Sequence, residues 1–191
     1  AGIVTAVGKE TPLNALDGIP ITSIESPHST TFENIYTDAG RAQYLRAQAA
    51  RVDLDTVPPL WRNASIIHLA PIANEIDSSL PNDFSPALLG VTPQGWMRRW
   101  DSSGRVSRSE WSDSESVLHK ANAVVISRED VNGDHELIEQ MAHQTRMLVV
   151  TEGAEGCVLH WNGDRRRFRA PDVNEVDATG AGDVFATAFF I

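Results

Sequence analysis

The C-terminal stretch of the sequence joins two glycines and two carboxylates to an uninterrupted apolar run. The string Asp177-Ala178-Thr179-Gly180-Ala181-Gly182-Asp183 is followed at 184–191 by VFATAFFI, which contains no charge and no helix breaker. This run predicts a helix that is apolar on all sides and therefore buried. We expect residues 180–182 to form its first turn, where small side chains leave backbone N–H groups accessible to an anion. The pattern predicts an anion site at the start of a buried helix.

The carboxylate of Asp183 would lie beside that anion site. Such a group can act as a general base if a hydroxyl must lose its proton there, attacking a phosphoryl group while the backbone amides hold the developing charge. A plain glycine turn between a strand and a helix explains the same residues, with Asp183 as an N-terminal charge that contributes about 0.3–1 kcal/mol. The glycines alone do not separate these interpretations.

The longer string from Asp177 to Asp183 resembles the signature of the PfkB, or ribokinase-like, family of sugar and nucleoside kinases. That family usually has Asp-Thr-Thr-Gly-Ala-Gly-Asp, so Ala178 is a departure at a position without an assigned chemical role. The resemblance implies that Asp183 is the catalytic base and that the backbone of Gly180, Ala181 and Gly182 is the anion hole. It also implies that Asp177 and Thr179 help to hold a monovalent cation such as K⁺, and that ATP and Mg²⁺ are required.

The composition limits the classes of protein to consider. With 191 residues, 41% of them hydrophobic, the chain is long enough for one domain with a core. A formal net charge of -10 argues against a nucleic-acid surface, and the short basic run Arg165-Arg166-Arg167 is typical of a solvated strand edge. The single cysteine, Cys157, excludes an internal disulfide. No apolar stretch is long enough to span a membrane and no signal-peptide pattern opens the chain, so we expect a cytoplasmic protein without a membrane partner.

The first part of the chain predicts short strands. Residues 1–7 form an apolar run, and residues 19–25, 30–36 and 42–45 alternate or contain β-branched side chains. We expect the last three to form an antiparallel group. The resemblance implies a small β lid within residues 19–45 that closes over the sugar, whereas the residues themselves are equally consistent with an ordinary surface hairpin.

From Leu60 onward, short apolar strands alternate with helical stretches, which is typical of βαβ units and a parallel sheet. We expect strands at 65–69, 88–91, 123–126 and 147–150, and helices at 114–120 and 134–146. The expected fold class is α/β: a ribokinase-like three-layer αβα domain covering residues 1–191, with a mostly parallel sheet. The resemblance implies that elements preceding Ala1 and following Ile191 complete that domain.

Two loops at the predicted carboxyl edge of the sheet suit phosphate binding. Thr151-Glu152-Gly153-Ala154-Glu155-Gly156 resembles the Thr-x-Gly-x-x-Gly segment of the family, which implies that Thr151, Gly153 and Gly156 contact nucleotide phosphates. A plain hairpin connection is the alternative. Ser127-Arg128-Glu129-Asp130 falls where the family commonly has Asn-x-x-Glu, which implies a nucleotide contact for Ser127 and a place for Asp130 in the magnesium network. Asp130 is one methylene shorter than Glu and would shift the water shell of the ion.

We therefore expect an ATP-dependent kinase whose partner is a small sugar, polyol or nucleoside. His68-Leu69-Ala70-Pro71, Thr92-Pro93-Gln94-Gly95-Trp96 and Arg98 are most similar to the branch that includes plant-type myo-inositol kinases. The sequence does not determine the oligomeric state, and a homodimer is one assembly that we consider. Two alternatives remain: a kinase-fold protein that binds a sugar or nucleotide for regulation, and a structural αβ domain in which the glycine turn serves packing alone.

Overall fold

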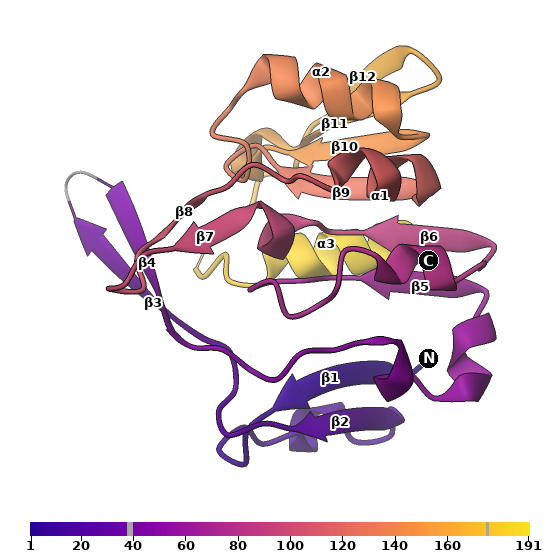
Figure 1. Cartoon of the computed structure of the whole chain (residues 1–191). Helices are drawn as coiled ribbons and strands as arrows, with labels where there is room; N and C mark the ends of the chain where they lie inside the picture. Colours follow the sequence, from indigo (N-terminus) through magenta and orange to yellow (C-terminus); the bar gives the residue numbers. More distant parts are fainter. Residues whose placement is uncertain (38–39, 175) are drawn as a thin grey trace.

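The computed structural model describes residues 1–37, 40–174 and 176–191. Its largest element is a six-stranded sheet with the order β12-β11-β10-β9-β6-β5 (Figure 1). β5, β6, β9 and β10 are parallel, and β11 and β12 extend the sheet in antiparallel fashion. The bounds are β5 (Ile66–Leu69), β6 (Leu88–Val91), β9 (Ala123–Ser127), β10 (Met147–Thr151), β11 (Cys157–Trp161) and β12 (Asp164–Phe168). All four predicted strands of the parallel part are confirmed.

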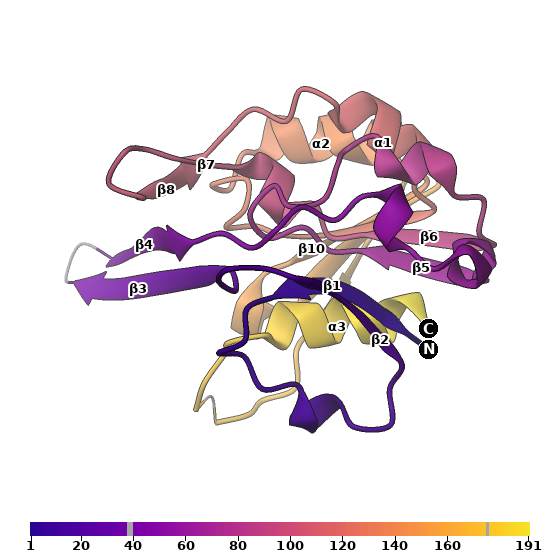
Figure 2. The same ribbon diagram turned by 60° about the horizontal axis from the view of Figure 1, so that its bottom comes forward.

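Helices cover both faces of this sheet. α1 (Ser114–Lys120) and α2 (His135–Gln144) lie on one face, and α3 (Ala181–Phe190) lies on the other (Figure 2). β9 and β10 read AVVIS and MLVVT and are almost wholly buried, as expected for parallel strands covered on both sides. Asp134 caps α2, because its carboxylate accepts a hydrogen bond from the Leu137 amide at 3.1 Å. The predicted three-layer αβα arrangement is confirmed.

A separate two-stranded sheet contains the N-terminal strand. β1 (Ile3–Val7) pairs in parallel with β2 (Ile21–Glu25), and Figure 1 shows this pair on the β5 side of the large sheet. The expectation that residues 19–25 belong to an antiparallel group is therefore wrong. Alternating side chains indicate a half-buried strand but carry no information on its direction. The direction is decided by the connection from residue 8 to 20, which is long enough for a parallel crossover.

Two hairpins project from the body at the same end of the molecule (Figures 1 and 2). β3 (Thr31–Thr37) and β4 (Gly40–Ala47) form the expected antiparallel hairpin, and β7 (Arg98–Trp100) pairs with β8 (Val106–Arg108). The Leu45 amide donates to the Gly104 carbonyl at 2.8 Å, which joins the two hairpins. Gly104 has φ +85°, and a Cβ there would collide with the Leu45 carbonyl oxygen. The contact therefore requires glycine at this position.

The C-terminal helix is not buried on all sides. Ala186 and Phe190 are buried against the sheet, whereas Val184 is 71% exposed and Ile191 is 90% exposed. The prediction of all-round burial is wrong because only one side of α3 faces the sheet, and within the described residues nothing covers its outer side. No helix in the described part of the chain is both long and apolar enough to cross a membrane.

Short 3₁₀ helices occupy several of the connections. They are η1 (Asn14–Leu16), η2 (Leu54–Thr56), η3 (Pro59–Asn63), η4 (Leu80–Asp83), η5 (Gln94–Met97) and η6 (Gly153–Glu155). Edge strand β12 contains the basic run, and its three arginines are exposed as predicted. Arg167 nevertheless has a specific partner, because its Nη2 lies 2.5 Å from an oxygen of Glu152, whose side chain is only 9% exposed.

Candidate active site

The start of α3 presents backbone amides without partners. Gly180 caps the helix in the left-handed conformation, with φ +78°, so the helix begins at Ala181 rather than at Gly180. The Ala181 amide donates to the Ala178 carbonyl at 3.1 Å, but the amides of Gly182 and Asp183 have no acceptor among the described residues. A Cβ on Gly182 would meet nothing within 4 Å. An anion could therefore approach these two amides directly.

Asp183 lies in the first turn of α3 and is exposed. Within the described residues its carboxylate forms no hydrogen bond and no ion pair. Two basic side chains lie within electrostatic range of it, His68 from β5 and Arg98 from the start of β7. Burial lowers the pKa of both side chains, and the Asp183 carboxylate acts in the opposite direction on each. The Asp183 carboxylate thus has no partner among the described residues and lies within electrostatic range of two basic side chains.

His68 is packed between the sheet and α3. Its Nε2 lies 3.1 Å from the Thr92 hydroxyl, and its ring meets Phe190 edge to face at 4.8 Å. Thr92 follows β6 directly, so these two side chains lie at neighbouring carboxyl ends of the sheet. The sequence indicated His68 and Arg98 only through their resemblance to one branch of the family. Polar side chains at the ends of apolar strands were the available signal.

Asp177 forms a tight turn before the helix. Its Oδ1 accepts a hydrogen bond from the Thr179 amide at 2.9 Å. Hydrogen bonds from the Thr179 side chain and amide lower the pKa of the Asp177 carboxyl, so the charged form is favoured at this fully exposed position. An ionised carboxylate and a hydroxyl in one turn are suitable oxygen ligands for a cation.

Ser127 and Thr151 lie side by side. They are paired in the register of β9 and β10, and the Arg128 amide donates to the Thr151 carbonyl at 2.9 Å. The Thr151 hydroxyl donates to the Ile126 carbonyl, 3.3 Å away. Gly153 has φ +57° and open space around it. Gly156 has φ +95°, and a Cβ there would collide with the Phe168 carbonyl of β12, so packing alone explains this glycine.

Both carboxylate oxygens of Asp130 already accept hydrogen bonds. Oδ2 accepts from the Ser127 amide at 2.8 Å, and Oδ1 accepts from Nε2 of Gln94 at 2.7 Å. In residues 1–37, 40–174 and 176–191 no three His, Cys, Asp or Glu side chains form a cluster that could hold a metal ion. Mg²⁺ in nucleotide sites is usually held by one or two carboxylates, waters and substrate phosphates. Asp130 therefore fits a role in orienting water on such an ion better than a role as one of several protein ligands.

The predicted site residues thus form two groups, one at the start of α3 and one at the ends of β9 and β10. No hydrogen bond or ion pair among the described residues joins them. Arg98 lies in electrostatic range of both groups, because Asp130 and Asp183 each act on its pKa. Arg98 is the first residue of β7, which belongs to one of the two projecting hairpins (Figure 1).

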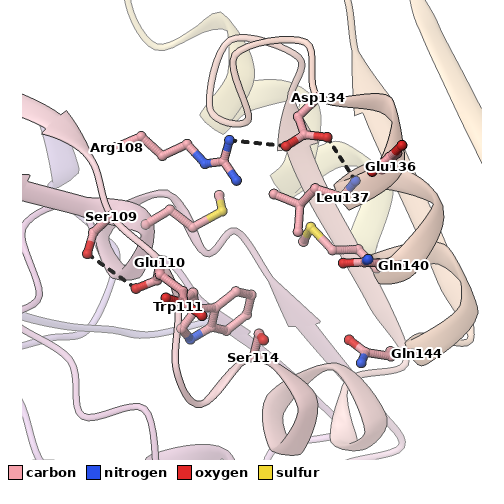
Figure 3. A pocket seen from close by; sticks show the side chains of 12 residues that line it. Arg108, Ser109, Glu110, Trp111, Ser114, Asp134, Glu136, Leu137, Gln140 and Gln144 are labelled. Carbon is pink, nitrogen blue, oxygen red and sulfur yellow. Dashed lines mark hydrogen bonds and ion pairs between the residues drawn. The ribbon is translucent and has the colours of Figure 1, made fainter.

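A separate pocket of about 620 Å³ lies on the α2 side of the sheet (Figure 3). Arg108 and Asp134 form an ion pair across its upper part at 3.4 Å, and Trp111 forms part of its wall. None of the residues predicted for phosphoryl transfer lines this pocket. We therefore do not assign the candidate active site to this pocket, since the residues predicted for phosphoryl transfer lie at the carboxyl edge of the sheet and at the start of α3.

The three-layer arrangement is the ribokinase-like fold. One solved structure of this class, the sulfate complex of a pyrophosphate-dependent kinase in the ribokinase family, superposes with a TM-score of 0.79 at 17% sequence identity. The alignment covers 97% of this chain and 70% of that one.

Sequence comparison supports the same class. Residues 112–190 match the model of the pfkB family carbohydrate kinases. Fructokinase from Escherichia coli is 26% identical, over 97% of this chain and 68% of the fructokinase. Inositol 3-kinase from Zea mays is 27% identical over 52% of this chain, which spans 26% of that relative. The predicted resemblance to the PfkB family and the expected class of carbohydrate kinases are confirmed.

Proposed function

We propose that this chain contains the catalytic base and the anion hole of an ATP-dependent phosphotransferase that acts on a hydroxyl of a small sugar, polyol or nucleoside. The observation that carries the proposal is the first turn of α3, where unpartnered amides at Gly182 and Asp183 occur together with the unpaired carboxylate of Asp183. Phosphoryl transfer to a hydroxyl requires both features, an open anion site and a proton acceptor beside it.

The reaction follows from this arrangement. Asp183 accepts the proton of the acceptor hydroxyl, whose oxygen forms a bond to the terminal phosphorus of the donor while the bond from phosphorus to the leaving oxygen breaks. The anion hole is the turn of Gly180, Ala181 and Gly182, in which the free amides of Gly182 and of the adjoining Asp183 bind the negative charge on the transferring group. Because these amides are already oriented by the helix, little reorganisation is needed as the charge develops.

The second group of residues would hold the donor. Ser127, Thr151 and Gly153 lie at adjacent strand ends and would contact its phosphates, with Gly156 shaping the same loop. Asp130 would orient a water on Mg²⁺, an ion that supplies charge neutralisation on the donor phosphates. Asp177 and Thr179 would help to bind K⁺ beside the anion hole. The structural neighbour described above is a pyrophosphate-dependent kinase, so both ATP and pyrophosphate should be tested as phosphoryl donors.

The test is phosphoryl transfer by the protein carrying this sequence, measured with ribose, fructose, myo-inositol and nucleosides as acceptors. We expect Asp183→Asn to lower turnover by about 10²–10⁴-fold, because the amide cannot accept the proton. Asp172→Asn, which removes an exposed carboxylate from the preceding loop, is the matched control and should leave turnover unchanged. Equal turnover in the Asp183 variant and the parent would contradict the mechanism. Donor binding without transfer to any acceptor would favour the regulatory alternative.

A further inference from the structure

We propose that Arg98 is a catalytic residue that binds the transferring phosphoryl group together with the free amides at the start of α3. The inference rests on the proposed function and adds a side chain that neither the family signature nor the fold comparison assigns. It concerns binding of charge only, since Arg98 forms no covalent bond and carries no proton in the reaction.

The guanidinium of Arg98 is partly buried and has no carboxylate in contact. Its Nη1 donates to the Ile72 carbonyl at 3.1 Å, and its Cζ lies 5.1 Å from the centre of the Phe32 ring. No ion pair to Arg98 occurs in the described ranges, although arginines such as Arg51 and Arg167 are paired at 2.6 and 2.5 Å. Burial lowers the pKa of Arg98. A partly dehydrated cation without a counter-ion is unfavourable, so an anionic ligand would stabilise this position.

The carboxylates near Arg98 have other partners. Asp130 accepts from Gln94 and from the Ser127 amide, as described above. Glu75 accepts from the Ile72 amide at 2.8 Å and from the Ala73 amide at 2.6 Å. Asp183 must remain unpaired to act as a base. These hydrogen bonds hold the surrounding negative charge in place, within electrostatic range of the guanidinium but out of contact with it.

The position of Arg98 suits a phosphoryl group. The side chain contacts Phe32 of the projecting β3–β4 hairpin and Ile72, which lies three residues after the end of β5. The backbone carbonyl of Arg98 accepts a hydrogen bond from the side-chain amide of Asn74 at 2.9 Å. Among the described residues, Nε and Nη2 of Arg98 have no hydrogen-bond acceptor. A guanidinium with free N–H groups can form paired hydrogen bonds with phosphate oxygens. The charge in the transition state is spread over three such oxygens, so the guanidinium and the α3 amides could share its binding.

The neighbouring Arg99 provides a matched control. It is exposed, and its Nε donates to the Ser107 hydroxyl at 3.3 Å. We expect Arg98→Gln to lower kcat by about 10²–10³-fold, the range found when one preorganised donor to a developing anion is removed. Arg98→Lys keeps the charge without the planar pair of donors, and its kcat should lie between those of Arg98→Gln and the parent. Arg99→Gln should stay within about twofold of the parent.

A second measurement does not depend on turnover. Binding of Mg²⁺-ATP and of inorganic pyrophosphate by calorimetry should weaken about tenfold in Arg98→Gln and remain unchanged in Arg99→Gln. Thermal unfolding establishes that the variants are folded. If Arg98→Gln does not fold, the same binding comparison is made with Arg98→Lys. Equal kcat and equal pyrophosphate affinity in the Arg98 and Arg99 variants would overturn the inference. If the parent phosphorylates no acceptor, the proposed function fails, and the binding comparison still decides the role of Arg98.

Discussion

Phe190 of α3 meets the imidazole of His68 edge to face, with ring centroids 4.8 Å apart and an interplanar angle of 67°. Gly90 is the partner of His68 in the β5–β6 register, and the Phe190 ring packs directly over it. A Cβ on Gly90 would lie 2.6 Å from Phe190 Cδ2, so the contact requires glycine. Asp183 precedes Phe190 by two helical turns and therefore lies on a similar side of α3. The packing of Phe190 thus orients the helix that presents the candidate base.

A side chain at position 90 should displace the helix. Gly90→Ala places a methyl group against the Phe190 ring, and we expect it to destabilise the protein by about 1–3 kcal/mol, the range for overpacked cores. Turnover should fall as well, because Asp183 moves with α3. In the double variant Gly90→Ala with Phe190→Leu, the smaller side chain at position 190 makes room for the added methyl group and should recover part of the stability. Denaturant unfolding measures both, and additive losses in the double variant would argue against this packing relationship.

Gly182 should tolerate a larger side chain in the fold but not in donor binding. No atom lies within 4 Å of a Cβ built there, and its φ lies outside the left-handed region, so Gly182→Val should change the unfolding temperature little. The branched side chain would block the free amides, and we expect donor affinity to fall more than tenfold. Thr187→Val, an exposed change in the same helix, is the control. Calorimetric titration with Mg²⁺-ATP and with pyrophosphate measures the donor affinity. Unchanged affinity in Gly182→Val would favour a turn that serves packing alone.

The arginines of β12 should differ in their contribution to stability. Arg167 neutralises Glu152, whose side chain is 9% exposed, and Arg128 approaches the same carboxylate at 3.4 Å. We expect Arg167→Ala to cost about 1–3 kcal/mol, because it leaves a nearly buried charged group with one distant partner. Arg165→Ala, on the same exposed strand, should change the free energy of unfolding by less than about 0.5 kcal/mol. Equal effects of the two changes would show that the Glu152 contact contributes nothing specific.

Stability should depend on pH through His68. Burial holds the pKa of folded His68 below 6.5, so between that lowered pKa and 6.5 the unfolded chain binds more protons than the folded one. The free energy of unfolding should therefore rise with pH across this window and level off above it. His68→Asn should remove part of that slope, and Asp183→Asn should widen the window because the Asp183 carboxylate raises the His68 pKa. Urea unfolding from pH 5 to 8 and NMR titration of His68 measure both effects. An unchanged His68 titration in Asp183→Asn would contradict the proximity of the two groups.

The local pattern of the chain was sufficient for most of the large sheet and for the glycine turn. Parallel strands covered on both faces are short apolar runs, so β5, β6, β9 and β10 could be predicted where they occur. The helix over 114–120 could also be predicted, and the start of α3 could be placed within one residue because glycines and an acidic residue precede an apolar run. These features depend on neighbours in sequence, which is why composition and spacing reveal them.

Partners that are distant in sequence could not be predicted in the same way. Alternation in residues 19–25 indicated a strand, but its parallel pairing with β1 depends on the path of the connection between them. The apolar run of α3 indicated burial all round, yet only the side that faces Gly90 and His68 is covered by described residues. Arg98 carries no local signal of its unpaired charge, because the hydrogen bonds that occupy Asp130 and Glu75 come from residues brought together by folding. A motif consists of residues that are adjacent in sequence, so it can be recognised without a structure. The electrostatic surroundings of a site arise from long-range contacts that exist only in the folded chain.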